Sequence, residues 1–277
     1  MFLLRTAFLP PTIEAFRDLL ERSLRELVQE NNAPQVFVEG RDYPCLSAIR
    51  IDLSGSVVTD RLPVPHQLPQ AKAQSALEAD HLEICASPMR IQGAPVQFHC
   101  RAEKVKFGEA VDDSGDLMLL LQQADSGKLE LAVAMSDLEQ LVRTLVTPLA
   151  RKQSIVLEDL RLRLTSENER SLRVELKVRV RKLFLNTQVH LTGNLEIDDE
   201  LNARLSSLDC AGDGTLGTLA CGFLFPHLKR LEEREFSLLN LPFGEVKLRD
   251  VRIAIGDQLQ VKAEFGTESG TSLGTNR

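Results

Sequence analysis

The glycine-rich segment from Gly212 to Gly217 has the spacing in this chain that most resembles a catalytic motif. Gly212, Gly214 and Gly217 match the pattern G-x-G-x-x-G, and they follow an expected strand and open an expected helix. Such a turn can present backbone N–H groups to a pyrophosphate. The segment before it is not the continuous apolar run of a buried parallel strand. Asn240 stands where a ribose-binding carboxylate would be expected. We therefore favour a structural turn, with a nucleotide-binding enzyme as the third hypothesis.

Acidic, histidine and cysteine side chains give no metal-binding pattern. The acidic residues near the ends of later strands do not have the spacing of an EF-hand loop. We interpret these as turn residues: Asp198, Asp199, Glu200, Asp209 and Asp213. His99 and Cys100 are neighbours in an expected strand, so they face opposite sides and cannot share a metal ion. No nucleophile motif such as G-x-S-x-G occurs. We expect no metal, no cofactor and no enzymatic activity.

Composition narrows the class of protein. The chain has 277 residues, of which 43% are hydrophobic and 26% charged, as in ordinary globular proteins. Its net charge of −7 argues against a general nucleic-acid binder, because phosphate binding needs a basic field. The five cysteines are scattered and lack a C-x-x-C pattern, so we expect free, mostly buried thiols in a reducing compartment. Without a clear signal peptide or transmembrane run, we expect a cytoplasmic location, with peripheral membrane contact as an option.

The stretch from 172 to 197 predicts strands with an apolar face, which the rest of the chain must cover. Apolar and charged residues alternate without exception from 172 to 180, and the alternation resumes after the turn-prone Asn186. A strand places successive side chains on opposite faces. This stretch therefore predicts two long antiparallel strands of one sheet, with one apolar face and one charged face.

The remaining periodicities predict helices over residues 12–30, 136–151 and 216–231. Thr12 is the expected N-cap of the first helix, and Ser136 with Glu139 forms an expected capping box of the second.

The other segments are expected to be mainly strands. Asp125-Ser126-Gly127 predicts a hairpin turn between strands at 116–122 and 128–134. A Pro- and Gln-rich loop is expected at 61–75, and a disordered tail at 267–277. The further expected strands cover residues 35–39, 46–58, 81–86, 94–107, 156–164, 200–210, 246–255 and 258–265.

The order of these segments is helix then strands, twice. We expect one elongated domain over residues 10–266, with halves at 10–134 and 135–266. Strands grouped apart from helices indicate an α+β fold with an antiparallel sheet.

The end of the chain, FSLLNLPFGEVKLRDVRIAIGDQLQVKAEFG, resembles the end of the bacterial LmeA-like phospholipid-binding family, and the likeness extends over residues 12–266. The matching elements are Leu241-Pro242-Phe243-Gly244, Asp250-Val251-Arg252, Gly256, and the V-x-V-E-G run of Val36, Val38, Glu39 and Gly40. The resemblance implies a tubular lipid-binding fold, in which long helices pack on a strongly curved antiparallel sheet around an apolar groove. It also implies binding of phospholipid or another amphiphile.

Two sets of residues are the candidate contacts for such a ligand. The expected groove lining consists of Leu138, Leu141, Val142, Leu145, Leu172, Val174, Leu176, Val178, Phe223 and Leu224. Between Arg151 and Lys182 ten Lys and Arg residues stand against five Asp and Glu residues. The candidates there for an anionic headgroup or membrane patch are Arg161, Arg163, Arg173, Lys177, Arg179 and Arg181. An ordinary packed core and an ordinary solvated sheet face are the alternative interpretations of these two sets.

The leading hypothesis is therefore a non-enzymatic lipid-binding protein that shields acyl chains between helix and sheet. The second hypothesis is a scaffold or protein-interaction domain with a filled core and no ligand.

Overall fold

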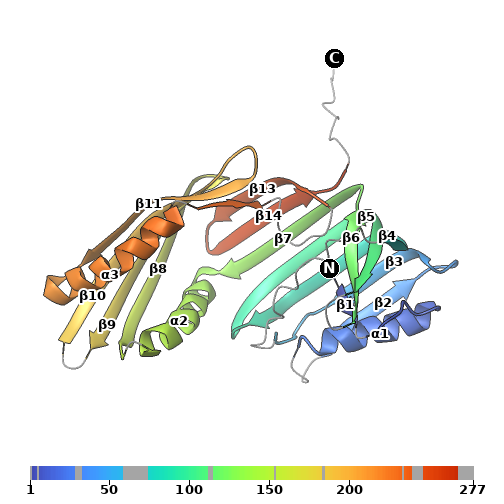
Figure 1. The fold of residues 1–277 in the computed structure, drawn as a ribbon, viewed down its shortest axis with the longest axis horizontal. Helices are drawn as coiled ribbons and strands as arrows, with labels where there is room; N and C mark the ends of the chain where they lie inside the picture. Colours follow the sequence, from blue (N-terminus) through green and yellow to red (C-terminus); the bar gives the residue numbers. More distant parts are fainter. Residues whose placement is uncertain are drawn as a thin grey trace, which may run out of the picture.

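A computed structural model describes residues 2–4, 6–28, 33–58, 74–111, 115–152, 154–182, 185–232, 234–238 and 246–267. Most of the expected loop at 61–75 lies outside the described residues, as do the tail from 268 onward and the Leu241–Gly244 element. The chain forms two β-sheets that lie side by side along the long axis of the molecule, with helices packed against them (Figure 1).

The first sheet combines strands from both ends of the chain. Within the described ranges it has nine strands, with the order β13-β14-β7-β5-β4-β3-β2, and with β6 pairing both β1 and β5. Only β3 and β4 among its neighbouring named strands run parallel. The strands are β1 (Phe2–Leu4), β2 (Gln35–Glu39), β3 (Cys45–Asp52), β4 (Gln74–Ile91), β5 (Ala94–Val111), β6 (Leu117–Gln123), β7 (Ser126–Ala134), β13 (Leu248–Ile255) and β14 (Gln258–Phe265).

The predicted hairpin across Asp125-Ser126-Gly127 is wrong. Strands β6 and β7 are not partners, because both pair with β5: residues 106–111 of β5 face β6, and residues 96–103 face β7. The 18-residue length of β5 lets two short strands lie one after the other along the same edge. The backbone N–H of Asp125 donates to the carbonyl of Glu103 at 3.0 Å and so holds the junction against β5.

Helix α1 (Ile13–Arg25) covers the inner face of the first sheet. The hydroxyl of Thr12 accepts a hydrogen bond from the Ala15 N–H at 3.2 Å, so the expected N-cap is confirmed. Phe16 and Leu20 are each 1% exposed and pack in one core with sheet residues that include Phe107. Burial of these apolar side chains at about 25 cal/mol per Å² is the main source of the stability of this core.

The second sheet has the strand order β12-β11-β10-β9-β8. The predicted antiparallel pair is confirmed, since β9 and β10 pair in register from Leu185 opposite Lys182 to Glu196 opposite Ser171. The strands are β8 (Val156–Asn168), β9 (Ser171–Lys182), β10 (Leu185–Ile197), β11 (Asn202–Gly212) and β12 (Glu235–Ser237). Helix α2 (Met135–Lys152) lies along β8, and helix α3 (Gly214–Glu232) lies over β11 and β10 (Figure 1).

The two sheets meet where residues at one end of the second sheet pack into the core of the first sheet. Ile197 and Leu201, from the end of β10 and the following turn, belong to the same buried cluster as Val251 and Ile253 of β13. The backbone N–H of Ile253 donates to the carbonyl of Glu169, in the turn between β8 and β9, at 2.6 Å. The joint therefore has an apolar interior and a direct backbone hydrogen bond.

The expectation of long helices packed on one strongly curved sheet is wrong. The described chain is mostly β, with two separate sheets and helices of 13 to 19 residues. Hydrophobic periodicity indicates which segments are strands, but it does not indicate how many sheets these strands form. The reason is that the apolar face of a strand can be covered either by a helix or by another sheet. The prediction of one domain over 10–266 stays a prediction. Strands β13 and β14, from its second half, pair into the sheet of its first half.

No helix among the described residues combines the length and apolar character needed to cross a membrane.

Candidate functional site

The apolar face of the second sheet carries four of the ten residues expected to line a lipid groove, all of them in β9. Leu162 on β8, Leu176 on β9 and Leu191 on β10 are direct cross-strand partners, so their side chains form one row. All three are partly exposed, as is the neighbouring Val174. Leu172 and Val178, at 8% and 9% exposure, are packed as ordinary core. The middle of this face is therefore aliphatic and accessible from outside.

Helix α2 borders this face on the β8 side. Its apolar stripe contains Leu138, Leu141 and Val142, which are partly exposed, and Leu145, which is 53% exposed. None of the side chains described for this helix is fully buried. A helix that exposes its apolar stripe in this way has apolar surface left to cover.

The contacts that hold α2 to β8 are polar and involve the outer edge of the sheet. The Glu139 carboxylate accepts a hydrogen bond from the Leu162 N–H at 2.8 Å. Arg143 donates to Asp159 at 3.1 Å and lies 3.4 Å from the carbonyl of Leu160. The expected capping box of Ser136 and Glu139 is not formed, because α2 begins at Met135 and Ser136 therefore lies inside the helix. Glu139 instead satisfies the edge strand, whose unpaired backbone groups would otherwise be open to another chain.

Helix α3 borders the face on the opposite side and is covalently attached to the sheet. A disulfide joins Cys210, at the end of β11, to Cys221 in α3, with Cα atoms 5.4 Å apart. The expectation that all five cysteines are free is wrong, and only Cys45, Cys85 and Cys100 remain thiols. The expectation of a reducing compartment depended on all cysteines being free, so the disulfide removes that argument for it. Phe223 and Leu224 lie in α3, but their side chains are outside the described part.

Packing explains the glycine pattern between β11 and α3. A Cβ added to Gly212 would lie 2.2 Å from the carbonyl carbon of Gly217, and one added to Gly217 would lie 2.5 Å from that of Gly212. The Thr187 hydroxyl of β10 donates to the Asp213 carbonyl at 2.8 Å and fixes the turn on the sheet. The glycines thus allow α3 to approach β11 closely, in agreement with the prediction that this G-x-G-x-x-G segment is a structural turn between a strand and a helix.

The six basic candidates lie on the face opposite to the apolar row. Arg161 pairs in register with Lys177, and Asp159 with Arg179, so these side chains share a face. All six are exposed. The sheet therefore lies between these cations and an acyl chain on the apolar face.

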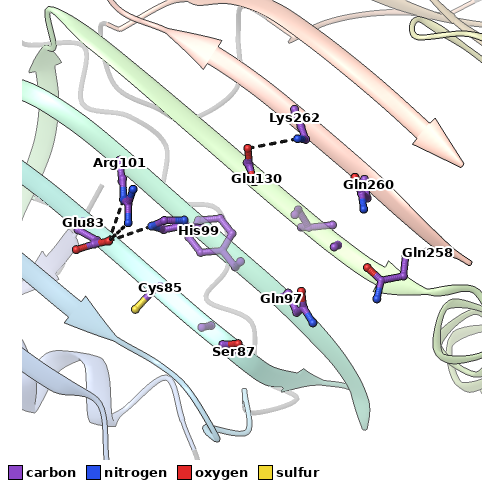
Figure 2. Close-up of a pocket in the computed structure, with 14 residues that line it drawn as sticks. Glu83, Cys85, Ser87, Gln97, His99, Arg101, Glu130, Gln258, Gln260 and Lys262 are labelled. Carbon is purple, nitrogen blue, oxygen red and sulfur yellow. Dashed lines mark hydrogen bonds and ion pairs between the residues drawn. The ribbon is translucent and has the colours of Figure 1, made fainter. Parts of the chain in front are cut away.

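A polar hollow of about 560 Å³ lies on the outer face of the first sheet, over β4, β5, β7 and β14 (Figure 2). The Glu83 carboxylate lies 3.0 Å from His99 Nε2 and accepts a hydrogen bond from Arg101 at 2.9 Å. Hydrogen bonds from His99 and then Arg101 hold the pKa of Glu83 below its usual value. Glu83 is therefore ionised at neutral pH, and its charge is balanced by the neighbouring Arg101. Sequence reasoning missed this cluster, because the three residues are spread over two strands.

Cys85 lines the same hollow, and its sulfur points away from His99 (Figure 2). Burial, followed by the charge of Asp52, raises the pKa of the Cys85 thiol. The thiol is therefore protonated at neutral pH, which is its unreactive form.

Metal-ligand clusters are not found among the described residues. Nδ1 of His81 lies 2.6 Å from a carboxylate oxygen of Glu103. The Asp198 carboxylate accepts hydrogen bonds from the backbone N–H groups of Glu200 and Asn202, at 2.9 and 2.8 Å. The interpretation of Asp198 as a turn residue is confirmed.

Comparison with known proteins gave no relative: no family model, no curated protein and no solved structure matches this chain. The resemblance to the LmeA-like family stays a prediction.

Proposed function

We propose that this protein binds a phospholipid or another amphiphile without chemical conversion, with the acyl chain lying on the apolar face of the second sheet between α2 and α3. The observation that carries the proposal is the row of Leu162, Leu176 and Leu191, which is aliphatic yet partly exposed. An enclosed tube is not part of the proposal, since the sheet is open.

The chemistry of the face favours an alkyl chain as its occupant. Leu and Val side chains offer no hydrogen bonds, so they select for apolar surface and not for a particular headgroup. Each CH₂ group moved from water onto such a surface contributes about 0.8 kcal/mol. The exposed Leu145 of α2 extends the same surface beyond the sheet.

The first experiment is organic extraction of the purified, tag-cleaved protein followed by mass spectrometry. We expect close to one equivalent of phospholipid or another amphiphile. A clean extract from folded protein, together with no uptake of a fluorescent fatty-acid probe, would reject lipid binding and favour the interaction-domain hypothesis.

A variant pair locates the binding surface. We expect Leu176→Asn to weaken binding of the fluorescent fatty acid by about tenfold or more, because the ligand would have to cover an unpaired amide at a cost of about 1–3 kcal/mol. The matched control is Leu219→Asn, the same change at a 55% exposed position of α3. Leu219 lies two residues from both Gly217 and Cys221, which face the sheet, so helical geometry turns it outward. Equal weakening by both variants would place the ligand elsewhere.

A further inference from the structure

The face of the second sheet opposite the apolar row carries an excess of exposed basic side chains, although the whole chain has a net charge of −7. Its cations come from two adjacent strands, β8 and β9, and lie on one side of the sheet because partners in register share a face. The side chains of Arg161, Arg173 and Arg181 are 78%, 54% and 50% exposed. We call this surface the basic face; it comprises Arg161, Arg163, Arg173, Lys177, Arg179 and Arg181.

Half of these cations are neutralised locally and half are not. Asp159 lies 3.4 Å from Arg161, Glu175 lies 3.5 Å from Arg173, and Glu158 lies 3.1 Å from Arg181. In contrast, Arg163, Lys177 and Arg179 have no ion-pair partner within the described ranges. Their charges therefore remain available to an external anion.

The geometry of this face suits a broad anionic surface. Arg161, Lys177 and Arg179 line a hollow of about 230 Å³ together with Gln188 of β10 and the carboxylate of Asp159, so three cations there face one anion. Next to Arg181, Val156 begins β8 with 49% of its surface exposed. An array of exposed cations with an exposed apolar side chain at its margin matches the headgroup layer of a bilayer and the apolar region beneath it.

We propose that the basic face docks the protein on the surface of a bilayer containing anionic phospholipid. Each Lys or Arg near such a surface strengthens binding about fivefold. A nucleic acid is disfavoured by the net charge of −7, and because single-stranded binders use aromatic side chains on which bases stack, whereas the cations here alternate with aliphatic residues. Docking goes beyond binding of a ligand on the apolar face and does not require one.

The test is co-sedimentation of the full chain with vesicles of phosphatidylcholine and phosphatidylglycerol at 3:1, and with vesicles of phosphatidylcholine alone. We expect binding to the anionic vesicles only, and loss of that binding when salt is raised from 50 to 300 mM, since screening weakens exposed charges. The triple variant Arg163→Gln, Lys177→Gln, Arg179→Gln should bind about a hundredfold more weakly, because three cations contribute about fivefold each. These side chains are exposed, so the variant should retain the circular dichroism spectrum and melting temperature of the parent.

A second triple variant controls for net charge. Lys104→Gln, Lys128→Gln and Lys262→Gln remove the same charge from exposed positions of the first sheet, where side-chain exposure is 72%, 74% and 56%. We expect this variant to bind the anionic vesicles like the parent. Absence of parental binding, equal loss in the two triple variants, or equal binding to uncharged vesicles would each overturn the proposal. Binding of a DNA duplex through Arg163, Lys177 and Arg179 without vesicle binding would overturn it in favour of a nucleic-acid surface.

The Leu176→Asn variant separates this inference from lipid binding on the apolar face. It should sediment with anionic vesicles like the parent, because Leu176 points away from the basic face.

Discussion

Arg170 and Asp250 form an ion pair across the joint between the two sheets, with 2.8 Å between Nη2 and Oδ1. Arg170 stands in the turn between β8 and β9, and Asp250 lies in β13 of the first sheet. Arg170 also contacts Asp199 at 2.6 Å, and Arg252 contacts Asp250 at 2.6 Å. The Asp250-Val251-Arg252 element noted in the sequence thus has a structural role, since its two charged ends belong to the network that joins the sheets.

Removal of the Asp250 charge should destabilise the protein. The side chain is only 17% exposed, and hydrogen bonds to a charged group contribute about 1.5–3 kcal/mol. We expect Asp250→Asn to lower the free energy of unfolding at pH 7 by about 1–3 kcal/mol, measured by urea denaturation. Glu264→Gln is the control, because Glu264 forms an exposed pair with Lys128 at 3.7 Å and should cost less than about 0.5 kcal/mol. Equal effects of the two changes would show that the joint does not depend on Asp250.

The contribution of Asp250 should depend on pH. Burial acts to raise its pKa, but hydrogen bonds from Arg170 and Arg252 outweigh burial and hold the pKa below its usual value. A depressed folded-state pKa stabilises the protein above the unfolded-state pKa of about 4, and this stabilisation is lost as pH falls through the folded value. We therefore expect the stability difference between parent and Asp250→Asn to be full at pH 7 and to shrink below about pH 4. Urea denaturation of both proteins at pH 7, 5 and 3 measures this stability difference. A difference that grows on acidification would contradict a lowered pKa of Asp250 in the folded protein.

The disulfide between Cys210 and Cys221 predicts three reactive thiols in denatured, unreduced protein, and five after reduction. Titration with a thiol reagent under both conditions tests this count.

The disulfide should also stabilise the protein. The bridged residues are 11 positions apart, and closing a loop of that size stabilises a protein by about 3 kcal/mol. We expect Cys221→Ser to lower the free energy of unfolding by about this amount. Cys45→Ser, at an exposed free thiol, should have little effect; five thiols before reduction would refute the bridge.

Gly212, the last residue of β11, and Gly222, in the middle of α3, should respond to alanine in opposite directions. Gly212→Ala would place a Cβ 2.2 Å from the Gly217 backbone, and we expect a loss of about 1–3 kcal/mol from overpacking. A Cβ on Gly222 would meet nothing within 4 Å, so Gly222→Ala should raise stability by about 0.5–1 kcal/mol through helix propensity. Thermal and urea denaturation of the two variants test the prediction, and a neutral Gly212→Ala would show that β11 and α3 do not pack this closely.

Much of the local structure could be predicted from the sequence. The unbroken alternation from 172 to 180 identifies β9 and assigns its side chains to two faces. The helical stripes locate α1, α2 and α3 to within a few residues, except that α1 ends at Arg25 and not near residue 30. The face assignment already implied that Leu176 and Lys177 cannot serve one lipid from the same side of the sheet.

The joint, the disulfide and the edge contacts could not be predicted in this way. Arg170 and Asp250 are 80 positions apart, and Glu139 reaches the Leu162 N–H across 23 positions. Nothing in the sequence near Cys210 distinguishes Cys221 from the other cysteines until α3 lies on the sheet.

The sequence by itself determined the three helices, most of the strands and which side chains share a face, because these follow from the periods of 2 and 3.6 residues. Only the tertiary structure decided that β6 and β7 both pair with β5, that β13 and β14 complete the first sheet, and that the chain makes two sheets. The physical reason is that backbone hydrogen bonds between strands are alike for every sequence. The choice of partner therefore depends on which buried surfaces fit together across the whole chain.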